Sequence, residues 1–285
     1  MRLAKTSGIA ARLLSVLITL FGISVFIFIV LRVIPGDTIT GSLGIETGVL
    51  TPEQIDDLKR YYGIDKPLLL QYFSWITSFL SGDLGFAYST GVSVLTLTAS
   101  SLPVTIELAL FGTISGVIMG IAIGMFSAKK PGSARDFFGQ LFGLLALAIP
   151  GFVLSTAIVT IMANKFGYFP NGYEYMTPWE DLWMNLQQML FPSIVLGIAV
   201  AAPVMRTTRS ALLETVDKDF IRTAFGKGLK SRTVQFRHVL RNSLIPIVTM
   251  TGIQFGYLLG GAVIVEKIFA LPGMGRQILD AINKR

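Results

Sequence analysis

Five long apolar segments constrain the fold of this chain more than any other feature of its 285 residues. Leu13 to Leu31 runs for 19 residues without a charge, and a helix of that length rises roughly 28 Å, enough to cross the hydrocarbon core of a bilayer. Charged residues make up only 14% of the chain, whereas soluble domains contain about 25%. The sequence therefore predicts an all-α membrane protein with five transmembrane helices. The other four segments cover about 103–127, 137–163, 189–205 and 244–265.

Lys and Arg gather on one side of the predicted spans. The N-terminus, the turn at 128–136 and the segment 206–243 together contain 15 Lys and Arg and four acidic residues, whereas the segments on the other side contain nine and 12. The positive-inside rule places the basic side in the cytoplasm. We therefore expect a cytoplasmic N-terminus, no removed signal peptide because no small-residue cleavage site follows the first span, and a C-terminus outside.

Residues 32–101 separate the first two spans and contain two predicted helices. Thr51 and Gln54 are spaced to form a capping box at the start of the first helix, and Gly63 is expected to end it. The second helix covers about 68–80, and its apolar face either lies on the bilayer surface or packs against the spans. That face comprises Leu69, Tyr72, Phe73, Ile76 and Phe79.

Glycine and proline occur at positions in the predicted spans that affect helix packing and continuity. Small residues spaced four apart let helices in lipid approach closely, so we interpret two glycine stripes as packing surfaces, with the alternative that one of them lines a moving interface. Pro150-Gly151 falls inside the third span and should kink or interrupt it. The stripes are Gly112, Gly116, Gly120 and Gly124 in the second span, and Gly252, Gly256 and Gly260 in the fifth.

The usual motifs for catalysis, metal binding and nucleotide binding are missing from the sequence. There is no cysteine, and His238 is the single histidine, which we interpret as structural or on the surface. Lys227 is followed by Gly228 and no P-loop occurs, so the chain is not expected to bind ATP itself. Glu107 is the only ionisable residue inside the predicted spans, whereas a proton relay usually needs several. We interpret it as an interfacial carboxylate or as part of a substrate path.

The stretch from Arg206 to Pro246 carries nine of the 24 Lys and Arg. It predicts a helix capped by Asp217 or Asp219, a left-handed turn at Gly228 and a second helix that Ser231 caps. The second helix is expected to run to about residue 242. The apolar residues of this stretch need a partner, which is either the anionic surface of the bilayer or the groove of another protein.

This stretch resembles the coupling loop of ABC importer permeases, most closely those of the dipeptide/oligopeptide/nickel family. The general motif of the superfamily is Glu-Ala-Ala, three residues, then Gly; here it reads Arg222-Thr223-Ala224 and Gly228, with Arg in place of Glu. The resemblance is carried by Asp219-Phe220-Ile221-Arg222-Thr223-Ala224-Phe225-Gly226-Lys227-Gly228-Leu229 and Phe236-Arg237-His238-Val239-Leu240-Arg241-Asn242-Ser243-Leu244-Ile245-Pro246. Further matches along the chain are Pro35-Gly36-Asp37, Tyr62-Gly63-Ile64-Asp65-Lys66-Pro67, Gly82-Asp83-Leu84-Gly85, Leu102-Pro103-Val104-Thr105-Ile106-Glu107-Leu108 and Phe269-Ala270-Leu271-Pro272-Gly273-Met274-Gly275-Arg276.

The resemblance implies the type I ABC importer (MetI-like) permease fold in the inner membrane of a prokaryote. It implies residues 1–31 as N-terminus and first span, 32–101 as the extracytoplasmic loop, and 102–285 as the core permease domain with a cytoplasmic coupling loop over 206–245. Family members generally continue into a sixth span, which is expected to be missing here because the chain stops at Arg285.

The resemblance also implies partners and roles. The chain would be a non-catalytic subunit that binds no cofactor or metal, while ATP and magnesium would bind to two cytoplasmic ATPase subunits. A second homologous permease subunit, an extracytoplasmic substrate-binding protein and membrane lipid are the other implied partners, with no nucleic acid. Coupling to the ATPases is implied for Asp219, Phe220, Ile221, Arg222, Thr223, Ala224, Phe225, Gly226, Lys227, Gly228 and Leu229.

The substrate is expected to be a di- or oligopeptide, or a glutathione-like peptide, delivered by the binding protein and moved by alternating access. The run from Gly252 to Tyr257 looks most like peptide-type members. Candidate residues of the substrate pathway are Glu107, Gln254 and Tyr257. A nickel or metal-chelate importer of the same family is an alternative, and a proton-coupled secondary transporter is an alternative of another class.

Overall fold

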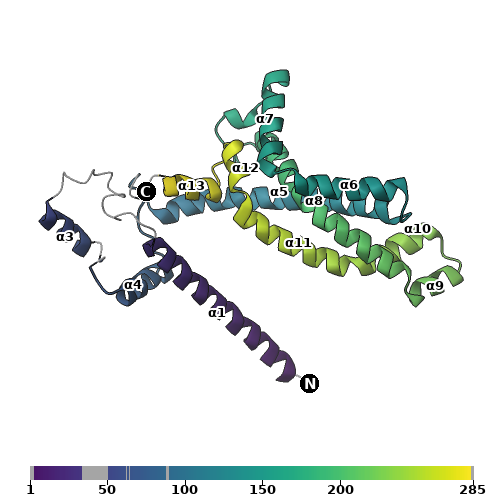
Figure 1. The fold of residues 1–285 in the computed structure, drawn as a ribbon, viewed down its shortest axis with the longest axis horizontal. Helices are drawn as coiled ribbons and strands as arrows, with labels where there is room; N and C mark the ends of the chain where they lie inside the picture. Colours follow the sequence, from purple (N-terminus) through teal and green to yellow (C-terminus); the bar gives the residue numbers. More distant parts are fainter. Residues whose placement is uncertain (1–2, 34–50, 62, 64, 88–89, 284–285) are drawn as a thin grey trace. The chain divides into compact units, whose positions relative to one another are not determined.

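The computed structural model describes residues 3–33, 51–61, 63, 65–87 and 90–283. The chain divides into two compact units, Met1–Leu97 with Asn283–Arg285, and Thr98–Ile282, and each is described by itself (Figure 1). The motif Pro35-Gly36-Asp37, together with Tyr62 and Ile64, lies outside the described residues.

The first unit contains α1 (Leu3–Val33), α3 (Pro52–Tyr61) and α4 (Leu68–Leu80). The predicted capping box is confirmed: the Thr51 N–H donates to Gln54 Oε1 at 2.9 Å, and the Gln54 N–H donates to Thr51 Oγ1 at 3.4 Å. Gly63 has a φ of 63° and donates its N–H to the Arg60 carbonyl, a left-handed stop that glycine adopts without steric cost.

Helix α4 packs on α1 through one residue of its predicted apolar face. Tyr72 is buried, its ring centroid lies 5.4 Å from that of Phe28, and its hydroxyl lies 2.8 Å from Ser24 Oγ. Leu69, by contrast, is 74% exposed, and Phe73 and Phe79 are also exposed. Packing against α1 is therefore confirmed for Tyr72, while Leu69, Phe73 and Phe79 have no such contact within this unit.

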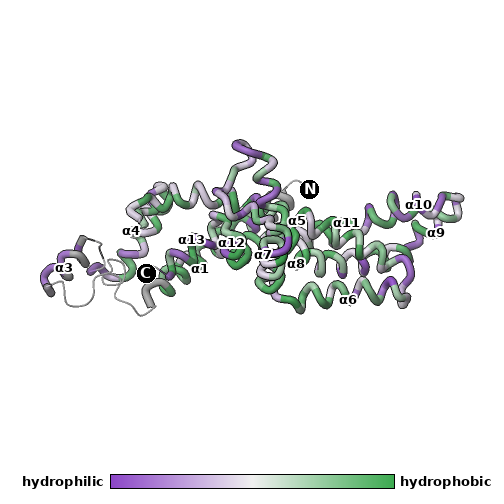
Figure 2. The backbone as a smooth tube through the Cα atoms, turned by 90° about the horizontal axis from the view of Figure 1, so that it is seen from above, coloured by the Kyte–Doolittle hydropathy of each residue, from purple (hydrophilic) through white to green (hydrophobic). Residues whose placement is uncertain are grey.

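The second unit is built around α5 (Val94–Ala128), α6 (Ala134–Ala148), α8 (Leu182–Val216) and α11 (Arg241–Gly261), which lie side by side (Figure 1). Helix α8 packs against α6 and α11, and it also packs against α5 at the glycine stripe of α5. In Figure 2 these helices are mostly hydrophobic, with hydrophilic residues concentrated towards α9 and α10. The elements are α5 (Val94–Ala128), α6 (Ala134–Ala148), α7 (Gly151–Phe166), η1 (Pro170–Gly172), α8 (Leu182–Val216), α9 (Asp219–Gly226), α10 (Ser231–Thr233), η2 (Val234–Leu240), α11 (Arg241–Gly261), α12 (Val263–Ile268) and α13 (Met274–Asn283).

The two predicted glycine stripes have different surroundings. A Cβ at Gly120 of α5 would lie 2.8 Å from Val204 Cβ and 2.9 Å from the Ala201 carbonyl oxygen, so the backbones of α5 and α8 approach closely. The rest of this stripe faces Leu196, Val200 and Thr208 in the same way, which confirms it as a packing surface. On α11, nothing in the described chain lies within 4 Å of a Cβ at Gly252, Gly256 or Gly260.

Pro150 interrupts the third predicted span, as expected. Helix α6 ends at Ala148, α7 begins at Gly151, and the two helices are bent by 92°. The residue before a proline is driven away from helical geometry by the proline ring, and Ile149 accordingly has a ψ of 115°. Among the described residues, four helices are long and apolar enough to cross a membrane, or five if the bent pair α6 and α7 counts as one.

Two helix boundaries differ from the prediction. Residues 206–216 continue α8, so the fourth span is one helix of 35 residues with Pro192 and Pro203 inside it. Residues 231–261 form another continuous helical segment, in which the π-helical turns of η2 join α10 to α11. The connection between the long helices is therefore shorter than the predicted 206–245, because both neighbouring helices extend into it.

Candidate functional site

The connection between α8 and α11 contains the short helix α9. Its N-cap is Lys218, with a ψ of 145° and no side-chain capping bond. Asp217 instead ends α8 as its C-cap, and Asp219 is the first residue of α9. The predicted capping by Asp217 or Asp219 is therefore wrong. Ser231 likewise follows the N-cap of α10, which is Lys230.

A glycine turn ends α9, as predicted. Gly228 has a φ of 74° and donates its N–H to the Phe225 carbonyl at 2.9 Å. The Leu229 N–H donates to the Ala224 carbonyl at 3.4 Å. This pair of bonds is the Schellman motif, in which a left-handed residue satisfies carbonyls at the end of a helix. The turn at Gly228 is confirmed, and it reverses the chain towards α10.

The inner face of α9 is anchored in a small apolar core. Ile221 is 1% exposed and Ala224 is 5% exposed. They share this core with residues from the end of α8 and from η2. Helix α9 therefore cannot tilt without moving α8 and η2 as well. The other buried members are Leu212, Val234 and Val239, with Met125, Ala128 and Leu240 packed against them.

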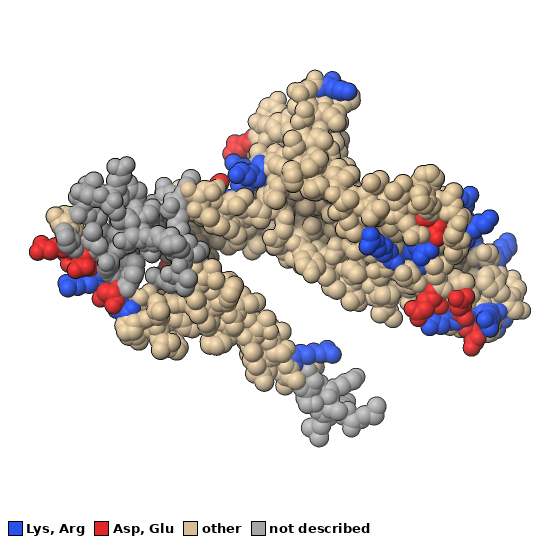
Figure 3. Space-filling model, viewed as in Figure 1, with Lys and Arg blue, Asp and Glu red and all other residues tan. Residues whose placement is uncertain are grey.

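The outer face of α9 has apolar residues that nothing in the described chain covers. Phe220 is 44% exposed, Phe225 is 49% exposed and Leu229 is 37% exposed. Of the eleven residues expected to couple, all but Ile221 and Ala224 are exposed. Lys and Arg gather over the same end of this unit in Figure 3.

Hydrogen bonds tie the base of this connection to the long helices. Ser243 Oγ in α11 lies 3.0 Å from Thr215 Oγ1 in α8, and it also lies 3.1 Å from the Ala211 carbonyl oxygen. Ser243 is 1% exposed. A displacement of α9 would therefore be transmitted to α8 and α11 together.

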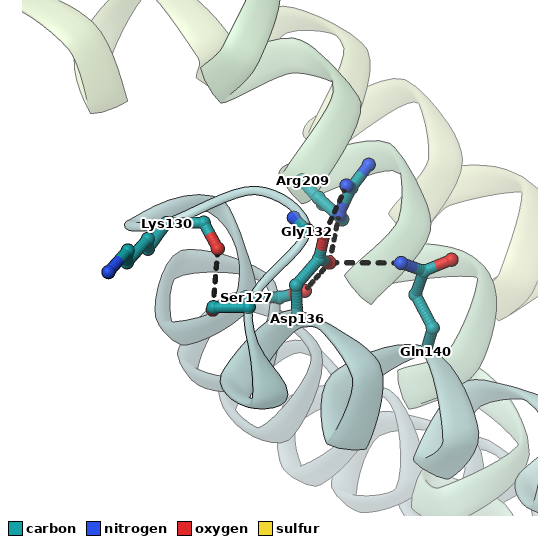
Figure 4. A network of polar contacts seen from close by, with 7 residues as sticks. Ser127, Lys130, Gly132, Asp136, Gln140 and Arg209 are labelled. Atoms are coloured by element: carbon teal, nitrogen blue, oxygen red, sulfur yellow. Dashed lines mark hydrogen bonds and ion pairs between the residues drawn. The ribbon is translucent and has the colours of Figure 1, made fainter.

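A buried ion pair near this end was missed by the sequence reasoning. Asp136 in α6 accepts hydrogen bonds from Arg209 Nε and Nη2, each at 2.7 Å (Figure 4). Its carboxylate also accepts bonds from Ser127 Oγ at 2.6 Å, from the Gly132 N–H at 2.9 Å and from Gln140 Nε2 at 3.1 Å. The only sequence signal was one acid within a basic turn. The pair joins the ends of α5 and α6 to α8.

Comparison with known proteins identifies the family. The profile of the family "Binding-protein-dependent transport system inner membrane component" matches residues 120–285, and the profile of its N-terminal region matches residues 7–109. The chain belongs to this family. It is thus a multi-pass inner-membrane permease subunit of an ABC importer, and the expected all-α, MetI-like fold is confirmed.

Named bacterial permeases align over nearly the whole chain. The glutathione transport system permease protein GsiC of Pectobacterium atrosepticum is 35% identical over 96% of this chain and 86% of its own length. The dipeptide transport system permease protein DppB of Lactococcus lactis is 34% identical over the same shares. A solved amino acid ABC transporter is 18% identical, with a TM-score of 0.47, over 67% of this chain and 80% of its own.

The three predicted pathway residues of the permease do not contact one another through hydrogen bonds in the described chain. Glu107 is half-buried in α5, and its Oε2 accepts a 2.7 Å hydrogen bond from the Tyr175 hydroxyl. Burial, and then this hydrogen bond to Glu107, raise the pKa of Tyr175 above its usual value. Gln254 is half-buried in α11, whereas Tyr257 is 71% exposed. No hydrogen bond in the described chain joins Glu107 to either of them.

A second buried carboxylate of the permease, Glu266 in α12, also escaped the sequence reasoning. It is fully buried, and it accepts hydrogen bonds from Thr105 Oγ1 at 2.7 Å and from the Arg276 N–H at 3.0 Å. Thr105 Oγ1 in turn accepts the Met274 N–H at 2.9 Å. A Cβ at Gly273 would clash with the Glu266 carboxylate, which explains a glycine there. The motif over 269–276 thus holds the start of α13 against α5 through the hydrogen bond between Met274 and Thr105.

Proposed function

We propose that this chain is the permease subunit of an ATP-driven importer for di- or oligopeptides, glutathione-like peptides included. Support for the substrate class comes from its relatives, which are named as glutathione and dipeptide transport permeases. The chain would move its substrate by alternating access, after delivery by an extracytoplasmic binding protein. It would itself be non-catalytic, with ATP and magnesium bound to its partners.

The exposed outer face of α9 is the single observation that carries the proposed coupling to ATP hydrolysis. Its inner face is held by Ile221 and Ala224, while Phe220 and Phe225 face outward. Exposed aromatic residues on a rigidly anchored helix are the kind of anchor that fills a pocket of a partner protein. We infer that this helix, with its Gly228 turn, docks into an ATPase subunit. Motion of the ATPases would then tilt α8 and α11 about the substrate path.

We further propose two ATPase subunits, a second homologous permease and a cytoplasmic N-terminus. The excess of Lys and Arg on the side of α9 supports this orientation. Glu107, Gln254 and Tyr257 remain proposed contacts of the substrate path. In support, Glu107 Oε1 is buried without a hydrogen-bond partner in the described chain. Tyr257 lies on α11 beside glycines whose open face no described residue covers.

The test is a Phe225→Glu substitution in the assembled transporter. Because Phe225 is half exposed, the change should leave the permease folded while it places a charge in the docking contact. We expect the affinity for the ATPase subunits to fall by at least ~30-fold, the loss typical of an interface hot spot. Hydrolysis of ATP stimulated by dipeptide or glutathione on the binding protein should fall with it.

Phe86→Glu is the matched control, since Phe86 is 68% exposed in the other unit. This variant should retain both ATPase binding and stimulated hydrolysis. Normal ATPase binding by Phe225→Glu would refute the docking role of α9. Hydrolysis that responds to neither peptide would refute the substrate class.

A further inference from the structure

A pocket of about 550 Å³ lies between α6 and α8, beside the Asp136–Arg209 ion pair. Its lining has two chemically distinct parts. Arg206, Arg209 and Ser210 of α8 supply polar groups, whereas Phe137, Leu141 and Leu144 of α6 supply an apolar wall. A ligand that fits must therefore combine a polar head with an apolar body.

The polar part of the pocket carries net positive charge. Arg206 is exposed and has no acidic partner within ion-pair distance in the described part of the chain. Arg209 gives its Nε and Nη2 to Asp136, and its Nη1 makes no hydrogen bond to any described residue. The pocket is thus lined by two guanidinium groups, only one of which is paired with a carboxylate. Guanidinium groups match the oxygens of phosphate well.

The apolar wall lies along α6, beside these basic side chains. Phe137, Leu141 and Leu144 are spaced four and three residues apart, so they form one stripe on α6. Phe137 is 62% exposed and Leu144 is 59% exposed. The stripe starts next to the basic turn of Lys129 and Lys130 and continues along α6 away from that turn.

We propose that this pocket binds an anionic phospholipid, with the phosphate at Arg206 and Arg209 and one acyl chain along the α6 stripe. The proposal rests on the orientation given under the proposed function, which puts this end at the cytoplasmic leaflet. Basic pockets between spans on that side recognise anionic headgroups. A transported peptide fits less well, because its amine needs a free carboxylate and Asp136 is 2% exposed with both oxygens already bonded.

The experiment uses the transporter assembled with its ATPases in nanodiscs that contain mostly phosphatidylcholine. A minority of phosphatidylglycerol carries a photoreactive acyl chain, and crosslinks to residues 134–148 are mapped by mass spectrometry. We expect this probe to label α6, and the same photoreactive chain on phosphatidylcholine to label it much less. Arg206→Gln should lower the labelling at least about tenfold, because it removes a charge-assisted hydrogen bond to the phosphate.

Two further variants separate the site from general effects. Leu144→Trp should also lower labelling, because the indole fills the groove without changing the charge. Lys130→Gln removes one charge from the exposed turn nearby and should label like the unmodified chain. Equal labelling by the phosphatidylcholine probe, or unchanged labelling of Arg206→Gln, would overturn the proposal.

Peptide-stimulated ATP hydrolysis is measured on the same samples. Loss of labelling on addition of the transported dipeptide would assign the pocket to the substrate path and overturn the lipid site. Hydrolysis without labelling would also overturn the lipid site while leaving the importer function standing. Labelling without hydrolysis would contradict the importer function and leave the lipid site standing.

Discussion

At the scale of single residues, Asp136 shows how a carboxylate can be buried at the end of a membrane helix. Its side chain is only 2% exposed, and hydrogen bonds from Arg209, Ser127, Gly132 and Gln140 surround its two oxygens. Burying a charge is costly unless it is paired and hydrogen-bonded, and removing one member of such a pair leaves the other uncompensated. The pair is therefore a point where a small chemical change should have a large effect.

Asp136→Asn should lower the free energy of unfolding by roughly 3 kcal/mol. This is the lower end of the range for a broken buried ion pair, chosen because Arg209 keeps 24% of its side chain exposed. Denaturant unfolding of the purified chain in detergent measures the change. Glu214→Gln is the control, because its 2.9 Å pair with Lys218 is exposed and such pairs contribute little. Equal losses in both variants would contradict the role given to burial.

At the scale of helices, the contact of α5 with α8 depends on the lack of side chains along one face. Gly112, Gly116, Gly120 and Gly124 face side chains of α8 that also recur every four residues. Without a hydrophobic driving force between helices in lipid, close backbone approach provides the packing energy. The stripe on α11 has the same spacing but lacks a neighbour in the described chain. Spacing alone therefore does not tell which stripe is packed.

Gly120→Ala and Gly256→Ala should change stability in opposite directions. Alanine favours a helix over glycine by about 1 kcal/mol, which should stabilise the open position of Gly256. At Gly120 the new methyl meets Val204 Cβ at 2.8 Å and a backbone oxygen at 2.9 Å, neither of which can move aside easily. Overpacking of about 1–3 kcal/mol then outweighs the helix preference. Unfolding of the purified chain in detergent measures both changes. A Gly120→Ala variant at least as stable as the unmodified chain would contradict the close approach.

At the scale of the whole molecule, the distribution of charge predicts the orientation on which the coupling proposal depends. In the predicted topology, the side that carries α9 contains 15 Lys and Arg and four acids. If this side faces the cytoplasm, α9 meets the ATPases and the segment at 167–181 faces outward. The opposite orientation would leave α9 without any source of ATP-driven motion.

Labelling of single cysteines in intact cells should show this orientation. The chain contains no cysteine, so each introduced thiol reacts alone. Trp179→Cys, at a position that is 92% exposed, should react with a membrane-impermeant maleimide from outside. Lys129→Cys, in the exposed turn before α6, should react only after the cells are permeabilised. The reverse pattern would refute the orientation and the coupling proposal with it.

Local signals predicted the turn at Gly228 well and its surroundings less well. Gly228 was recognisable because its turn needs a left-handed residue, a requirement met by neighbouring atoms alone. The caps at Asp217 and Asp219 were predicted wrongly. Buried residues such as Leu212 and Thr215 extend α8 to Val216, which leaves Asp217 as its C-cap. Sequence also could not show that Ile221 and Ala224 point inward while Phe220 and Phe225 point out, because that depends on where α8 and η2 lie.

The sequence by itself determined the membrane class, the apolar segments, the break at Pro150 and the family motifs, since each depends on residues close together in the chain. Only the tertiary structure decided that Asp136 meets Arg209 across 73 positions and that Glu266 meets Thr105 across 161. It also decided which glycine stripe is packed. Such contacts depend on which helix faces are brought together, and the periodicity of one helix specifies a face without specifying its neighbour.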